Sequence, residues 1–119
     1  MTIVLCEPGK IARIEEIEEG LDSYQKIVGG LIQAVYPYDD PVAVICNDEG
    51  KLLGLPMNRG LKRGGKLYDI LCGTFFVCGL GEEDFCGLSD ELAEKYLKVF
   101  FYPERFLRNV MVTHLPEDE

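Results

Sequence analysis

Short apolar segments separated by turn-forming residues are the feature of this chain that most restricts its fold. Pro8-Gly9, Gly29-Gly30 and segment 36–41, which contains two prolines and two aspartates, interrupt the chain at short intervals. Glycine favours turns because it adopts positive φ angles, and proline favours them because its ring fixes φ. The pattern therefore predicts several short strands joined by turns.

The β-branched and apolar segments between these interruptions are the predicted strands. They are Thr2–Glu7, Lys10–Ile17, Leu31–Val35, Val42–Cys46, Lys51–Leu55 and, around a bend at Gly73, Leu67–Leu80. Asn47-Asp48-Glu49-Gly50 predicts a tight hairpin turn. Pro56–Lys66 contains four glycines or prolines and few apolar residues, so it is predicted to be an exposed loop.

Two segments have the spacing of amphipathic helices. Leu21, Tyr24, Ile27 and Val28 predict a short helix that Gly29-Gly30 ends. The second helix combines a Ser89 cap with acidic residues in its first turn, and Pro103 stops the chain beyond it. Its apolar stripe consists of Leu92, Ala93, Tyr96, Leu97 and Phe100.

The order of these elements is typical of a single small α+β domain. We expect a mostly antiparallel β-sheet with two α-helices packed on one face. Residues 1–100 form the predicted domain, and residues 101–119 form a C-terminal extension whose last residues, Pro116–Glu119, are an acidic tail. A chain of 119 residues is long enough to bury a hydrophobic core.

The charge of the whole chain excludes one class of function. Its 21 acidic and 12 basic residues give a formal net charge of −9. General DNA binding requires a basic face that neutralises phosphates, so no such role is expected. No leader and no stretch of about 20 apolar residues is found, which predicts a soluble cytoplasmic protein without membrane contact.

The residues that commonly carry out catalysis are few or unsuitably spaced. His114 is the only histidine, and a surface or packing role is expected for it. The cysteines, at positions 6, 46, 72, 78 and 86, are odd in number and form no C-x-x-C pair, so we expect reduced thiols. Cys6, Cys46, Cys72 and Cys78 lie among apolar residues and are expected in the core. No catalytic residue, metal site or cofactor is predicted.

One glycine-rich segment is similar to a phosphate-binding loop in its spacing only. Residues 60–66 fit G-x-x-x-x-G-K, but Leu67 stands where serine or threonine would hold magnesium. A phosphate-binding loop opens a helix, whereas the residues after Lys66 have strand character. The match is therefore interpreted as chance.

Positive charge is concentrated in one segment. Lys51–Tyr68 contains five basic and no acidic residues, and the rest of the chain carries a net charge of −14. Two interpretations are open: the segment recognises an anionic ligand or acidic partner, or it packs against the acidic body of the protein.

Several spaced blocks of the sequence resemble a known family. The blocks are Cys6–Lys10, Leu21–Gln25, Val28–Gly30, Ile45–Lys51, Gly54–Arg59 and Ile70–Phe76. Together they resemble a small domain of unknown function found in Gram-positive bacteria, their phages and mobile elements, often in association with antirestriction-type proteins. The resemblance covers about Thr2 to Phe100. It implies a role between mobile DNA and host defence, and it implies no activity or catalytic residue.

The function predicted from these observations is that of a non-enzymatic binding protein that engages a host protein, such as a defence factor. The alternative is a small-molecule or nucleotide-binding domain that uses the basic segment Lys51–Lys66. The predicted binding residues are Asn47, Lys51, Asn58, Arg59, Lys62, Arg63 and Lys66. Asn47, Asn58 and Arg59 are expected on two adjacent turns that present a binding surface. An edge strand and the aromatic segment 100–102 are compatible with a homodimer.

Overall fold

The core of the protein is a six-stranded antiparallel sheet. The computed structural model describes residues 1–107 and 111–114. The sheet has the order β2-β1-β7-β4-β3, and β8 pairs with β7 outside this path. Its strands are β1 (Thr2–Cys6), β2 (Arg13–Glu16), β3 (Ile32–Val35), β4 (Val42–Asn47), β7 (Phe75–Leu80) and β8 (Phe85–Cys86).

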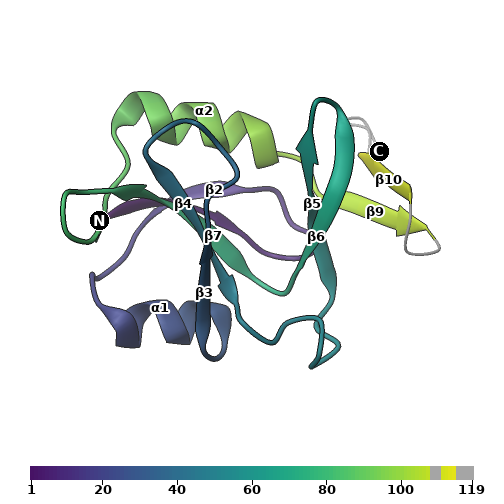
Figure 1. Ribbon diagram of the computed structural model, residues 1–119, viewed down its shortest axis with the longest axis horizontal. Coiled ribbons are helices and arrows are strands. Elements are labelled where there is room, and N and C mark those ends of the chain that lie inside the picture. Colours follow the sequence, from purple (N-terminus) through teal and green to yellow (C-terminus); the bar gives the residue numbers. More distant parts are fainter. Residues whose placement is uncertain (108–110, 115–119) are drawn as a thin grey trace.

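The two helices cover opposite faces of this sheet. Helix α2 (Asp90–Phe100) lies on one side and α1 (Leu21–Val28) on the other (Figure 1). Val42 and Val44 of β4 belong to the apolar cluster that contains α2 residues, whereas Ala43 and Ile45 belong to the cluster that contains α1 residues. Alternate residues of a strand point to opposite faces, so each cluster fills one face.

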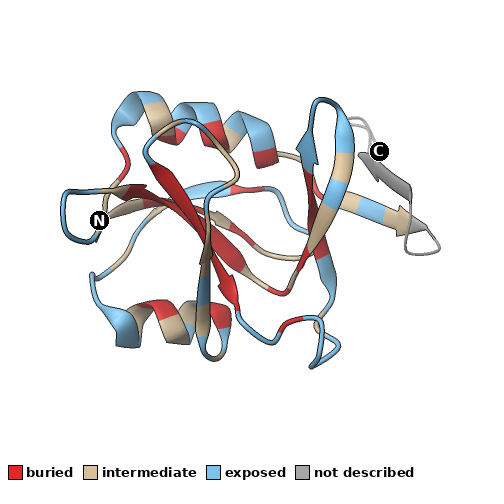
Figure 2. Cartoon of the chain, viewed as in Figure 1, coloured by how far each residue is buried: buried red, intermediate tan, exposed pale blue. Residues whose placement is uncertain are grey.

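The α+β class and the mostly antiparallel sheet are confirmed, but the prediction that both helices pack on one face is wrong. The physical reason lies in β4 and β7, whose residues are buried almost without interruption (Figure 2). A strand that is apolar on both sides must be covered on both sides. The unbroken apolar runs 42–46 and 75–78 were the signal for this arrangement.

Helix α2 begins as predicted. The Ser89 side chain accepts a hydrogen bond from the Leu92 amide at 3.2 Å, and Asp90 and Glu91 lie in the first turn. The buried residues Ala93, Tyr96 and Phe100 form the face that packs on the sheet.

A second, two-stranded sheet stands beside the first. Strands β5 (Met57–Arg63) and β6 (Lys66–Cys72) form a hairpin at one end of the main sheet (Figure 1). Residues 56–66 are therefore not a loop, and no strand covers 51–55, which follow β4 as turns. Gly64 and Gly65 have φ angles of 59° and 80°, as a type I′ turn requires. The glycines thus mark a hairpin turn rather than a long exposed loop.

The chain continues beyond α2 into a third sheet. Strands β9 (Glu104–Leu107) and β10 (Met111–His114) pair with each other. The predicted acidic tail Pro116–Glu119 and the side chain of His114 lie outside the described residues. None of the helices formed by the described residues is long and apolar enough to cross a membrane.

An acidic side chain connects the loop before β4 to helix α2. Asp40 Oδ2 accepts hydrogen bonds from Lys95 Nζ at 2.5 Å and from the Tyr96 hydroxyl at 2.7 Å. These donors lower the pKa of Asp40 below its ordinary value of 3.8. The unfolded chain therefore binds this proton more tightly than the folded chain does, and the contacts stabilise the fold above the unfolded pKa.

We expect Asp40→Asn to lower the free energy of unfolding at pH 7. The difference from the unmodified chain should shrink as the pH falls through the folded pKa of Asp40, because the wild-type carboxylate is then protonated as well. Urea unfolding between pH 3 and 7 measures this. Asp39→Asn removes the same charge at an exposed neighbour and is the control; an equal, pH-independent effect of both variants would contradict the prediction.

Candidate functional site

The structure divides the seven predicted binding residues into three groups. Asn47, Asn58 and Arg59 are buried, with at most 6 % of their surface exposed. Lys51 is exposed but pairs with a carboxylate. The remaining three, Lys62, Arg63 and Lys66, are exposed at the end of the β5–β6 hairpin. The prediction that the first group lies on a presented surface is wrong.

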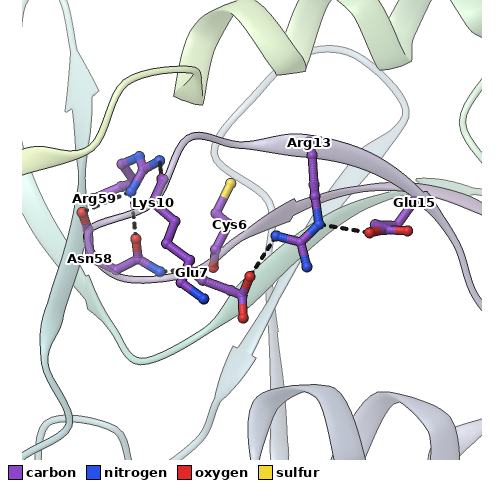
Figure 3. A network of polar contacts seen from close by, with 7 residues as sticks. All are labelled: Cys6, Glu7, Lys10, Arg13, Glu15, Asn58 and Arg59. Carbon is purple, nitrogen blue, oxygen red and sulfur yellow. Dashed lines mark hydrogen bonds and ion pairs between the residues drawn. The ribbon is translucent and has the colours of Figure 1, made fainter.

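Arg59 connects the hairpin to the rest of the protein. Its Nε donates to the carbonyl of Phe100, the last residue of α2, at 3.0 Å. Nη2 donates to the Lys10 carbonyl at 2.6 Å, and Nη1 donates to Asn58 Oδ1 at 2.8 Å (Figure 3). The guanidinium thus binds one oxygen of its own strand and one from each of two distant segments.

Asn58 extends this network towards the main sheet. Its Nδ2 donates to the carbonyl of Cys6, at the end of β1, at 2.9 Å and to that of Gly73, between β6 and β7, at 2.8 Å. Gly73 has a φ of 84°, and a Cβ there would lie 2.7 Å from the side chain of Leu55. The Asn58 amide therefore fixes the bend at which the chain leaves the hairpin for the sheet.

The buried charge of Arg59 is placed where backbone oxygens compensate it. Burial lowers the pKa of its guanidinium, and the Cys6 thiol and Glu104 oppose this effect. The last carbonyls of a helix have no partner within the helix and carry partial negative charge, so a cation there is stabilised.

Asn47 has the same role at the other helix. Its Nδ2 donates to the carbonyl of Val28, the last residue of α1, at 3.2 Å, while its Oδ1 accepts from the Glu49 amide at 2.8 Å. A Cβ on Gly30 would lie 2.9 Å from the Asn47 amide nitrogen. Asn47, like Arg59, satisfies a helix carbonyl that would otherwise be unpaired.

Three basic side chains at the end of the hairpin are exposed and carry positive charge. Within the residues that the structure describes, no carboxylate forms an ion pair with Lys62, Arg63 or Lys66. The Arg63 guanidinium lies 4.9 Å from the centre of the Tyr68 ring, a cation–π distance. Packing of the basic segment against acidic groups is thus seen for Lys51, which pairs with Asp69, and not for these three.

A cavity of about 430 Å³ lies along β6. Its lining includes Met57 and Cys72 together with four consecutive residues of the strand, 67–70, and Lys51 stands at its border. A second cavity, of about 280 Å³, shares Lys51, Asp69, Ile70 and Cys72 with it. Sequence reasoning assigned these strand residues no role, because a strand pattern does not show which distant segments lie beside the strand.

Burial keeps three of the cysteine thiols protonated. Burial raises the pKa of the Cys6 and Cys78 thiols to about 12 and that of Cys46 to about 11. Thiols held in this form are poor nucleophiles. Cys72 is only partly buried, contrary to the prediction of a core position. Among the described residues, no group of three or more His, Cys, Asp or Glu side chains could hold a metal ion.

These features define a small α+β domain with a cationic hairpin fastened to it by buried polar side chains. The chain belongs to the family described as a domain of unknown function (DUF3846), whose profile matches residues 1–101. The predicted resemblance to a domain of unknown function is thereby confirmed. Comparisons with curated proteins and with solved structures gave no match.

The network predicts a large difference between two arginines of the same hairpin. Arg59→Met should lower the free energy of unfolding by about 3 kcal/mol, because it leaves buried carbonyls and Asn58 Oδ1 without a donor. Arg63→Met, at an exposed position, should change it by about 0.5 kcal/mol or less. Urea denaturation measures both, and similar losses in the two variants would show that Arg59 does not hold the fold together.

Proposed function

We propose that this domain is a non-enzymatic binding protein of phage or mobile-element type that engages a host protein through the β5–β6 hairpin. The single observation that carries the proposal is the exposed cluster of Lys62, Arg63 and Lys66, which has no ion-pair partner among the described residues of a chain whose net charge is −9.

The shape of the hairpin favours a macromolecular partner. Small-molecule sites are concave, whereas the three cations surround the turn at the end of a two-stranded sheet. Charges at the border of an interface attract a partner of opposite sign and suppress partners of the same sign. The acidic body of the protein repels nucleic acid in general. An acidic patch on a protein is therefore the favoured target.

The proposed type of partner rests on the resemblance noted in the sequence. That resemblance implies an association with mobile elements and antirestriction-type proteins, and we therefore propose a host defence factor as the target. Loss of restriction or CRISPR interference in cells that express the domain would support this choice, and unchanged interference together with failure to recover a specific partner would reject it.

Reversal of charge at the hairpin should abolish capture of this partner. We expect the triple variant Lys62→Glu, Arg63→Glu, Lys66→Glu to bind at least about tenfold more weakly in pull-downs from host lysate, because the attraction becomes repulsion. Capture by the unmodified chain should also weaken as salt increases.

The matched control changes three exposed lysines elsewhere, Lys10, Lys26 and Lys98, to glutamate. It has the same net charge as the hairpin variant. Equal loss of capture in both triples would show that net charge, rather than the hairpin, governs binding, and unchanged capture by the hairpin variant would reject the proposed contact.

A second candidate function is binding of an anionic small molecule beside the hairpin. The observation that favours it is the cavity of about 430 Å³ bordered by Lys51 and by Tyr68, over which Arg63 lies. Such a volume suits a nucleotide-sized ligand. Thermal shift measurements with nucleotides and cyclic dinucleotides should then show stabilisation that rises with ligand concentration and is lost in Lys51→Ala. A flat response to every compound would reject this candidate.

A further inference from the structure

Strand β3 lies at one edge of the main sheet. Among the described residues it pairs only with β4, and the strand order ends with it. Its partners along β4 run from Asn47, opposite Ile32, to Val44, opposite Val35. The other side of β3 is therefore a sheet edge with no described strand beside it.

A hydrogen bond just before β3 shows which of its main-chain groups face this edge. The Asp48 amide donates to the Leu31 carbonyl at 2.8 Å, one position beyond the first pair of the ladder. In an antiparallel ladder, pairs that exchange hydrogen bonds alternate with pairs whose N–H and C=O groups point away from each other. The main chain of Gln33 therefore bonds to β4, whereas Ile32 and Ala34 direct their N–H and C=O groups to the outer edge.

The hydrogen bonds on the far side of β4 agree with this assignment. The Leu80 amide donates to the Pro41 carbonyl at 2.8 Å, so the odd-numbered residues of β4 bond to β7 and the even-numbered ones bond to β3. Within the part of the chain that the structure describes, no hydrogen bond outside the strand pairs reaches the main chain of Ile32 or Ala34. These groups are therefore open to a further strand.

The two end strands of the main sheet differ in charge. Three of the four residues of β2 are charged, and Arg13 in that strand forms ion pairs with Glu7 and Glu15. Charged side chains are a common means of preventing contact between sheet edges. Residues 27–38, which include all of β3, contain no charged side chain. The edge at β3 thus lacks the charges that protect the edge at β2.

Apolar side chains are exposed at both ends of β3. Leu31 precedes the strand and Tyr36 follows it, and each is more than half exposed. Between them, Ile32 and Ala34 pack on the apolar cluster of one sheet face and Val35 on that of the other. An uncharged edge of this kind is a template for pairing with another chain.

A second copy of this chain fits the edge because the edge is complementary to itself. A two-fold axis at Gln33 sets Ile32 of each copy opposite Ala34 of the other, so that the outward N–H and C=O groups of both residues are matched. The same axis sets Leu31 opposite Val35. Each copy has a net charge of −9, so contact between copies is favoured where it brings no charged groups together. The segment that contains β3 meets this condition.

We infer that β3 is the dimerisation edge of this protein, where two copies pair antiparallel about a two-fold axis at Gln33. Their main sheets become one continuous sheet, and Ile32 and Ala34 of each copy exchange main-chain hydrogen bonds with the other. The exposed side chain of Leu31 packs on Val35 of the second copy. This edge is separate from the β5–β6 hairpin, so the inference goes beyond the proposed function and is tested independently of it.

Opposite charges at residue 33 test this pairing. Gln33 is exposed, so Gln33→Lys and Gln33→Glu leave the core unchanged. At about 100 µM we expect the unmodified chain to sediment with the mass of two chains and each variant alone with the mass of one, because like charges then stand opposite each other. An equimolar mixture of the two variants should recover the mass of two chains. Unfolded variants could not do so, which separates lost pairing from misfolding.

The same two substitutions at the other edge are the control. Ile14 of β2 is exposed, and both Ile14→Lys and Ile14→Glu should keep the mass of two chains. Dissociation of these variants to the same extent as the variants at Gln33 would show that the contact is not at β3, and would overturn the inference.

Hydrogen exchange measured by NMR locates the contact within β3. Exchange of the Ile32 and Ala34 amides should slow at least about threefold from dilute to concentrated samples, whereas exchange of the Gln33 amide, already bonded to β4, should not change. Unchanged exchange of Ile32 and Ala34 would overturn the dimerisation edge. So would a single-chain mass for the unmodified protein, two-chain masses for the separate Gln33 variants, or a mixture that fails to recover the mass of two chains.

Discussion

The buried guanidinium of Arg59 is the interaction on which the arrangement of the structure depends. It holds the end of α2 and the loop after β1 through the carbonyls of Phe100 and Lys10, and it orients Asn58, which binds the ends of β1 and β6. A two-stranded hairpin is only marginally stable in water by itself. The β5–β6 hairpin is therefore a fixed part of the domain because a charged group, desolvated at some cost, fastens its base.

Buried polar side chains also hold the ends of the two helices that cover the main sheet. The covered strands β4 and β7 supply the apolar surface, while Asn47 and Arg59 each satisfy the final carbonyl of one helix. Helix ends that approach a core bring unpaired carbonyls with them, and these must find donors. Three of the predicted binding residues, Asn47, Asn58 and Arg59, therefore stabilise the fold and do not lie on the surface.

The sequence was sufficient to predict the elements whose signals are local. The cap at Ser89, the stop at Gly29-Gly30 and the bend at Gly73 all depend on neighbouring residues, and helices and strands lie there as expected. It was not sufficient for the hairpin, because glycine serves loops and type I′ turns alike. It also failed for Asn58 and Arg59, since their partners, Phe100 and Cys6 among them, are more than 40 residues away.

Five basic residues that look alike in the sequence therefore have three different environments. Arg59 is buried within the fold, and Lys51 forms an ion pair with Asp69. Lys62, Arg63 and Lys66 are exposed beside the hairpin turn. Carboxylates also accept from the amides of two opposed hairpin residues, Glu104 from Gly60 and Asp69 from Ile70. Asp69 also pairs with Lys51, so this carboxylate connects β6 to the segment that follows β4. Position in the fold, rather than the number of basic residues, therefore decides which of these cations have no ion-pair partner among the described residues.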